Sequence, residues 1–211
     1  MYKFSKHVLL LFQPGICVDI LSKLHDQLAE SEEKDRIVVL MFDAMHIRPH
    51  LEYNAFSDCV SGVVHMDSET RSGEVAQSLL VFMLRSMFRG WTQLIGHHFT
   101  PSAFHQKDLR QLLDYYLSAL DTAGLVCRAV VCDQEPSHVS MFREAGVSKD
   151  APYIRCPSSG RKVFIIFDPP HLLKSTRNNL MTSDFLVSSR NTFAFIFTCY
   201  MFAFFYFCVY F

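Results

Sequence analysis

Residues 36–43, RIVVLMFD, constrain the fold more than any other stretch of the chain. Six consecutive apolar residues follow Arg36, and the run ends on the carboxylate of Asp43. A strand without polar alternation is typical of the middle of a sheet that is covered on both sides, so we predict a central strand here. An unpaired carboxylate loses its hydration when it is buried. Asp43 is therefore either solvated at the edge of the sheet or held there for chemistry.

Hydrophobic periodicity predicts alternating strands and helices along the rest of the chain. Amphipathic helices are predicted at residues 14–35, 106–125 and 137–147. Strands are predicted at residues 58–66, 92–100, 127–133 and 162–168, the first of them as a neighbour of the central strand. Residues 78–88, SLLVFMLRSMF, fit a helix or a strand equally well. This order indicates an α/β fold, in which a mixed sheet carries helices on both faces.

Composition excludes several classes of protein. Hydrophobic residues make up 50% of the chain and charged residues 19%, which is typical of a chain with a packed core rather than a disordered one. The formal net charge of −1 gives no overall basic signal for nucleic-acid binding, but it is compatible with a local basic patch. The seven cysteines are scattered without a C-x-x-C pair, so we interpret them as reduced thiols.

Three of the predicted strands end on an aspartate, namely Asp43, Asp133 and Asp168. The carboxyl ends of strands in such sheets cluster at one rim, where ligands bind. Carboxylates that meet there repel one another unless a cation lies between them, and Mg²⁺ or Mn²⁺ suits oxygen ligands of this kind. The alternative interpretation is structural, because aspartate also caps turns and helices. Spacing alone does not select which two of the three belong together.

Four segments resemble, in this order, the RNase H-like domain of P-element-type transposases, including relatives that carry a THAP zinc finger. The segments are MFDAMHIRPHLEYN, VFMLRSMFRGWTQLIGHHFT, VVCDQEPSHVSMFREAGV and FDPPHLLKSTRNNL. The last is the most specific, and the resemblance covers about residues 14–182. It implies an RNase H-like mixed sheet of about five strands with flanking helices, preceded by one amphipathic helix.

The resemblance also implies an activity: metal-dependent DNA cleavage and strand transfer. Asp43 and Asp133 correspond to the first two catalytic carboxylates of the family and would bind Mg²⁺ or Mn²⁺. Asp168 ranks below them as a metal ligand, because its block leads towards a nucleotide-binding insertion in the family. The implied partners are transposon ends and target DNA, with self-association, and the implied location is the nucleus.

A polar, basic group of residues follows the third of these aspartates. Lys174, Arg177 and Asn178 suit contacts to DNA phosphates, and the alternative interpretation is a solvated helix face.

The chain departs from the family pattern at several points. Ala44 replaces the glutamate that usually follows the first aspartate, and Glu135 and Pro136 stand where a small, glycine-rich step is usual. The family's nucleotide-binding insertion and its third carboxylate, a glutamate on a later helix, are expected to be missing after about residue 183. We therefore predict a truncated domain that is inactive alone. The alternative is a non-catalytic module for DNA binding or protein interaction, derived from a transposase.

The domain organisation predicted from these patterns has three parts: residues 1–35 with the amphipathic helix, 36–183 with the incomplete RNase H-like domain, and a hydrophobic tail at 184–211. Residues 192–211 carry no charge, and their length would span a bilayer. One hypothesis is that residues from about 185 onward are a translated intron or a frame-shifted end. The competing interpretation is a membrane anchor, with Arg177 and Arg190 on the cytoplasmic side.

Overall fold

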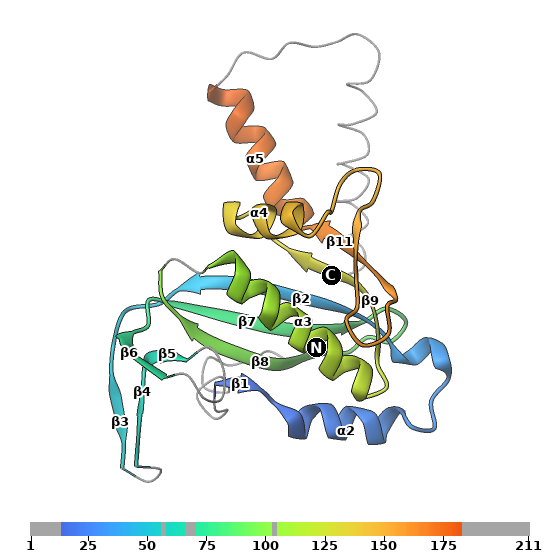
Figure 1. Cartoon of the computed structure of the whole chain (residues 1–211), viewed down its shortest axis with the longest axis horizontal. Helices are drawn as coiled ribbons and strands as arrows, with labels where there is room; N and C mark the ends of the chain where they lie inside the picture. Colours follow the sequence, from blue (N-terminus) through green and yellow to red (C-terminus); the bar gives the residue numbers. More distant parts are fainter. Residues whose placement is uncertain (1–13, 56–57, 66–70, 103–104, 183–211) are drawn as a thin grey trace. The chain divides into compact units, whose positions relative to one another are not determined.

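The computed structural model describes residues 14–55, 58–65, 71–102 and 105–182 (Figure 1). The tail predicted at residues 184–211 lies outside this part of the chain. Within the described residues, no helix is both long enough and apolar enough to cross a bilayer. The chain divides into two compact units: Met1–Cys132 with Pro136–Ile166, and Asp133–Glu135 with Phe167–Phe211.

Helices and strands follow one another much as the hydrophobic patterns predict. The helical elements are α2 (Val18–Leu28), the 3₁₀ turn η1 (Glu33–Arg36), α3 (Gln106–Thr122), α4 (Pro136–Glu144) and α5 (Pro169–Thr182). The strands are β1 (Gly15–Ile16), β2 (Ile37–His46), β3 (Glu52–Asn54), β4 (Cys59–Ser61), β5 (Val63–His65), β6 (Arg71–Val75), β7 (Ser78–Ser86), β8 (Thr92–Thr100), β9 (Val126–Cys132), β10 (Tyr153–Arg155) and β11 (Lys162–Phe167).

β2 lies in the interior of a large mixed sheet, as its apolar sequence predicts. The strand order is β10-β11-β9-β2-β7-β8-β5-β6, with β1 paired to β8, which makes nine strands among the described residues (Figure 1). β2 pairs with β9 in parallel and with β7 in antiparallel orientation. The predicted RNase H-like sheet of about five strands corresponds to β11, β9, β2, β7 and β8, and short strands extend it at both edges.

The ambiguous apolar run at residues 78–88 forms a strand, β7. It pairs with β2 along nine residue pairs, from Val38 opposite Ser86 to His46 opposite Ser78. From Leu80 to Ser86 its residues alternate between buried and half-buried. This alternation follows from the pleat of a strand, in which successive side chains point to opposite faces. Pairing with β2, which is distant in the sequence, thus selects the strand where the local sequence allows either a helix or a strand.

The main core lies on one face of the sheet, beneath α3. The Tyr116 ring of α3 stacks on Phe82 of β7 with 3.9 Å between ring centroids, and Phe82 lies 5.5 Å from the Phe42 ring of β2. The apolar stripe of α3 is buried throughout and consists of Leu109, Leu113, Tyr116, Leu117 and Leu120. Helical spacing predicted this stripe, and the helix at residues 106–125 is confirmed.

The opposite face of the sheet is less covered than the sequence suggested. In β2, buried Val38, Leu40 and Phe42 alternate with half-buried residues in the described part of the chain. Phe164 and Ile166 of β11 are each 45% exposed to solvent. A wholly apolar strand therefore does not establish two covered faces, because the sequence does not say which face the helices occupy.

The prediction of a strand at residues 58–66 beside the central strand is wrong. The segment forms two short strands, β4 and β5, which are interrupted at Gly62. Gly62 has a φ of +93°, and a side chain there would collide with the carbonyl of His50. β5 pairs with β6 and β8, and β4 pairs with β3, so neither lies next to β2. The left-handed backbone that glycine permits ends one strand and begins another.

Candidate functional site

Asp43 lies inside β2 rather than at its end, which corrects the sequence-based prediction. The strand continues for three more residues to His46, and Asp43 pairs with Val81 of β7. The side chain is exposed, and its Oδ1 accepts a hydrogen bond from the backbone N–H of Ala44 at 2.9 Å. The pairing that ends near Asp43 is the parallel one between β2 and β9, whose last residue pair is Met41 and Val131.

Asp133 follows β9 directly and begins the loop that leads into α4. Val131 is the register partner of Met41, and Asp133 stands two residues after Val131, just as Asp43 stands two residues after Met41. The Asp133 carboxylate accepts a hydrogen bond from the backbone N–H of Glu135 at 3.1 Å. This turn-forming bond is typical of aspartate at the end of a strand.

Asp168 occupies the step between β11 and α5, as predicted. Its carboxylate lies 3.0 Å from Nδ1 of His171, one helical turn further along α5. Burial raises the pKa of Asp168 above its usual range, the paired His171 opposes this shift, and the negative charge of Asp133 adds to it. The charges of Asp133 and Asp168 therefore interact, although the family resemblance ranks Asp168 below Asp43 and Asp133 as a metal ligand.

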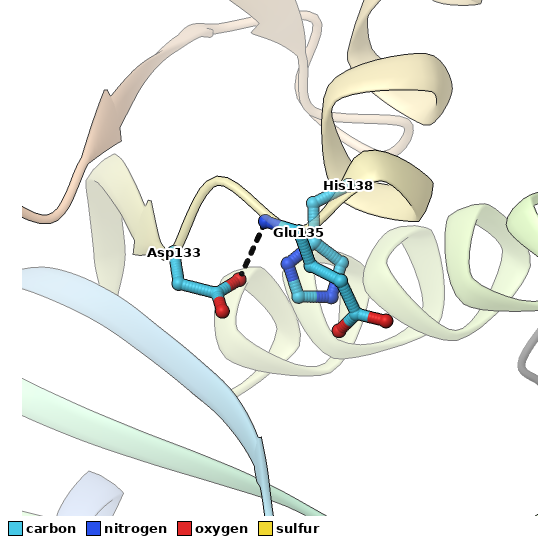
Figure 2. Close-up of side chains that lie close together, drawn as sticks. All are labelled: Asp133, Glu135 and His138. Atoms are coloured by element: carbon cyan, nitrogen blue, oxygen red, sulfur yellow. Dashed lines mark hydrogen bonds between the residues drawn. The ribbon is translucent and has the colours of Figure 1, made fainter. Parts of the chain in front are cut away.

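The loop after β9 carries further possible metal ligands. Asp133, Glu135 and His138 each offer one ligand atom, and these atoms lie within 4.8 Å of one another (Figure 2). His138 is buried and packs its ring edge-on against Phe42, with 5.0 Å between ring centroids. The sequence analysis treated Glu135 only as a departure from the family pattern. The D-x-E spacing was the signal that could have identified it.

A polar pocket of about 250 Å³ is formed by the loop after β9 and by α5. Its lining consists of Asp133, Gln134, Glu135, His171, Lys174, Ser175 and Asn178. Two of the three residues predicted to contact nucleic acid, Lys174 and Asn178, thus belong to one pocket. The third, Arg177, is not among the lining residues described for α5, and its guanidinium donates a hydrogen bond to the Asn178 side-chain oxygen at 3.2 Å.

Sequence reasoning named neither Ser175 nor His171 among the site residues. His171 lies three residues before Lys174 and four before Ser175, and residues at these spacings are neighbours on a helix surface. Helical spacing from His171 could have grouped them once α5 was recognised. Arg177 also lies three residues after Lys174, so spacing alone does not predict which residues line the pocket.

The residues present fit a hard divalent cation. Asp133 and Glu135 supply carboxylate oxygens, which Mg²⁺ and Mn²⁺ prefer over sulfur ligands. The charge of Asp133 contributes to the raised pKa of Asp168, so Asp133 and Asp168 repel one another, and a cation near these two carboxylates would relieve that repulsion.

Comparison with known proteins identifies relatives of this chain. A family model described as "TNP-like, RNase H N-terminal domain" matches residues 12–146. The chain is 23% identical over 175 residues to the transposable element P transposase of Drosophila melanogaster, covering 82% of this chain and 21% of that protein. It thus spans about a fifth of the length of this curated relative.

A solved structure shares the fold. The Drosophila P element transposase strand transfer complex superposes with a TM-score of 0.62 at 22% identity, covering 83% of this chain and 37% of that one. The resemblance to P-element-type transposases that the four sequence segments suggested is confirmed, and so is the RNase H-like fold.

Proposed function

Since the chain belongs to the family of TNP-like RNase H N-terminal domains, we propose that it is the metal-binding part of a DNA transposition domain. Asp43 and Asp133 would hold Mg²⁺ or Mn²⁺, with Asp168 as a weaker contributor. The substrate would be double-stranded DNA, at transposon ends and at the target, and the site of action would be the nucleus. Self-association of the chain on DNA belongs to the same proposal.

The parallel ladder between β2 and β9 is the observation that carries this proposal. Its last pair is Met41 and Val131, and each of these residues is followed two positions later by an aspartate. Residues an even number of positions apart along a strand point to the same face. One of these carboxylates lies within β2 and the other directly after β9, and together they would bind a divalent cation.

The chemistry follows from the ligands. When bound, divalent cations activate a nucleophile and stabilise a leaving oxygen during phosphodiester cleavage. The protein residues supply the charge that attracts the cations and orient them against the DNA.

Direct binding of Mn²⁺ tests the proposal independently of cleavage. Calorimetric titration should detect Mn²⁺ binding to the chain, and Asp43→Asn and Asp133→Asn should each weaken it at least tenfold, because each removes one charged ligand (about 1.4 kcal/mol for a tenfold change). Asp150→Asn, which changes an exposed carboxylate outside the pocket lining, is the matched control. Equal Mn²⁺ affinity for all three variants and the unmodified chain would refute the metal site.

A non-catalytic DNA-binding module is the second candidate, and the cationic side chain of Lys174 in the pocket favours it. It predicts salt-dependent DNA binding that survives Asp43→Asn and Asp133→Asn. Tethering of either form to a membrane through residues 192–211 would appear as partition into detergent that is lost when residues 185–211 are deleted.

A further inference from the structure

One side of α5 forms a continuous polar stripe. His171, Lys174, Ser175 and Asn178 follow one another at intervals of three, one and three residues, which places them along a single side of the helix. All four line the pocket that they share with the loop after β9. Leu172, Leu173 and Thr176 point elsewhere and are half-buried, so the helix packs with a different side.

The stripe carries the hydrogen-bond donors of a phosphate site. An ammonium group, a hydroxyl and a side-chain amide are among the groups that contact DNA phosphates, whereas sequence is read by contacts to base edges. The imidazole of His171 is the only ring in the pocket lining, so the described lining offers little for stacking a base. The chemistry therefore suits a backbone phosphodiester better than a nucleobase.

The charges of the pocket explain how an anion could enter a site that contains carboxylates. Asp133 and Glu135 bring two negative charges to the lining and Lys174 brings one positive charge. A divalent cation near the carboxylates changes the sum of these three charges from −1 to +1. The pocket volume of about 250 Å³ is far above the roughly 10–15 Å³ that a single water needs by the same measure, so a phosphate group and a cation can share it.

From these observations we propose that Lys174 and Asn178 are positioning residues that bind a DNA backbone phosphate next to the cation. This inference rests on the proposed function. Lys174 supplies the charge for the phosphate, and Asn178 supplies an amide donor one turn further along the stripe. The stripe would thereby hold the DNA strand in register with the metal-binding carboxylates.

The experiment measures affinity of the full chain for duplex DNA by fluorescence anisotropy over a range of salt concentrations, in Ca²⁺ and in EDTA. Lys149→Ala is the matched control for Lys174→Ala, because it also removes one exposed positive charge and Lys149 does not line the pocket. Arg177 is unsuitable as a control, because its guanidinium donates a hydrogen bond to Asn178. In Ca²⁺, Lys174→Ala should reduce the slope of log affinity against log salt by about 0.9, the value for one lost phosphate contact. Asn178→Ala should weaken binding about tenfold and leave that slope unchanged.

Two readouts separate this inference from the proposed function. Mn²⁺ should bind Lys174→Ala at least as tightly as the unmodified chain, since Lys174 is not a metal ligand and its positive charge opposes a cation in the same pocket. In EDTA the contrast between Lys174→Ala and Lys149→Ala should persist at lower overall affinity, so it can be measured even if the chain binds no metal. Equal losses of slope for Lys174→Ala and Lys149→Ala in both buffers would overturn the phosphate site. Absence of Mn²⁺ binding alone would instead overturn the proposed function.

Discussion

Gly96 lies where β8, β1 and α3 meet, and Gly96→Ala should destabilise the protein severely. A Cβ at this position would overlap the Tyr116 hydroxyl and lie 3.0 Å from Cζ of the same ring. It would also lie 2.6 Å from the carbonyl oxygen of Gly15 in β1. Both neighbours must move, because ordinary contacts of a Cβ begin at 3.4 Å. Neither moves easily, since one is a packed ring and the other is backbone.

The magnitude follows from what Tyr116 does in the core. Its ring is fully buried and stacked on Phe82, and its hydroxyl forms a hydrogen bond with Nε2 of His98 at 3.0 Å. Overpacking of a core costs about 1–3 kcal/mol. Separation of a buried hydrogen-bonded pair costs about 1–3 kcal/mol more. We therefore expect Gly96→Ala to lower the free energy of unfolding by about 2–6 kcal/mol, a large part of the total for a typical domain.

Urea unfolding followed by circular dichroism would measure this loss. Gly90→Ala is the matched control, because a Cβ at Gly90 has no heavy atom within 4 Å. Its effect should stay within about 0.5 kcal/mol, as for other surface substitutions. A similar, small effect of both substitutions would refute the packing argument.

A double-mutant cycle identifies the cause of the loss. Tyr116→Phe removes the hydroxyl that the new methyl group would overlap, so it should cost less in the Gly96→Ala background than in the unmodified chain. The two effects should fail to add by about 0.5–3 kcal/mol, the range for residues in contact. Additive effects would show that the collision with Gly15, and not the one with Tyr116, dominates.

Two further predictions concern titratable groups. Arg89 donates hydrogen bonds of 2.9 and 2.6 Å to the Asp35 carboxylate, and this bonding, more than the charge of Arg89, lowers the pKa of Asp35. Arg89→Met should therefore lower the urea midpoint at neutral pH. The difference in midpoint between the variant and the unmodified chain should shrink as acid protonates Asp35, well below the pKa of about 3.9 that an aspartate has in an unfolded chain. Burial, followed by the charge of His65, lowers the pKa of His97. Near pH 6.5 the imidazole of His97 should therefore bind a proton in the unfolded chain and remain unprotonated in the folded chain. On acidification through this range the free energy of unfolding should fall by up to about 1.4 kcal/mol per pH unit. The slope should be smaller for His97→Gln.

The elements that local pattern specifies were predictable from the sequence. The stripe of α3 shows a helical periodicity over enough residues to exclude a strand. The apolar run of β2 shows no periodicity, but its short length and its β-branched residues favour a strand. β7 shows no such preference, and only its antiparallel partner β2 determines that it is a strand. The misplaced strand at residues 58–66 depends on the backbone of Gly62, which the sequence letters do not reveal.

The candidate site was predictable in its parts and not in its geometry. The repeated strand-Asp pattern singles out Asp43, Asp133 and Asp168 without selecting a pair, and the charge of Asp133 contributes to the raised pKa of Asp168. It placed Asp43 at the end of its strand, whereas β2 continues to His46, because β7 offers further partners after the ladder with β9 has ended. Glu135 and Ser175 became recognisable only after the loop and the helix that carry them had positions in space.

The pairing of β2 beyond Asp43 has a consequence for which ions the proposed site can accept. Asp43 belongs to a strand whose ladder with β7 continues through His46, whereas Asp133 belongs to a loop. Mg²⁺ demands nearly ideal octahedral geometry, while larger ions such as Ca²⁺ accept irregular coordination at longer distances. In the proposed site, adjustment to the ionic radius would therefore come from the loop residues and not from the paired strand. Discrimination between small and large cations would then depend on how far residues 133–135 can move, and not on the strand.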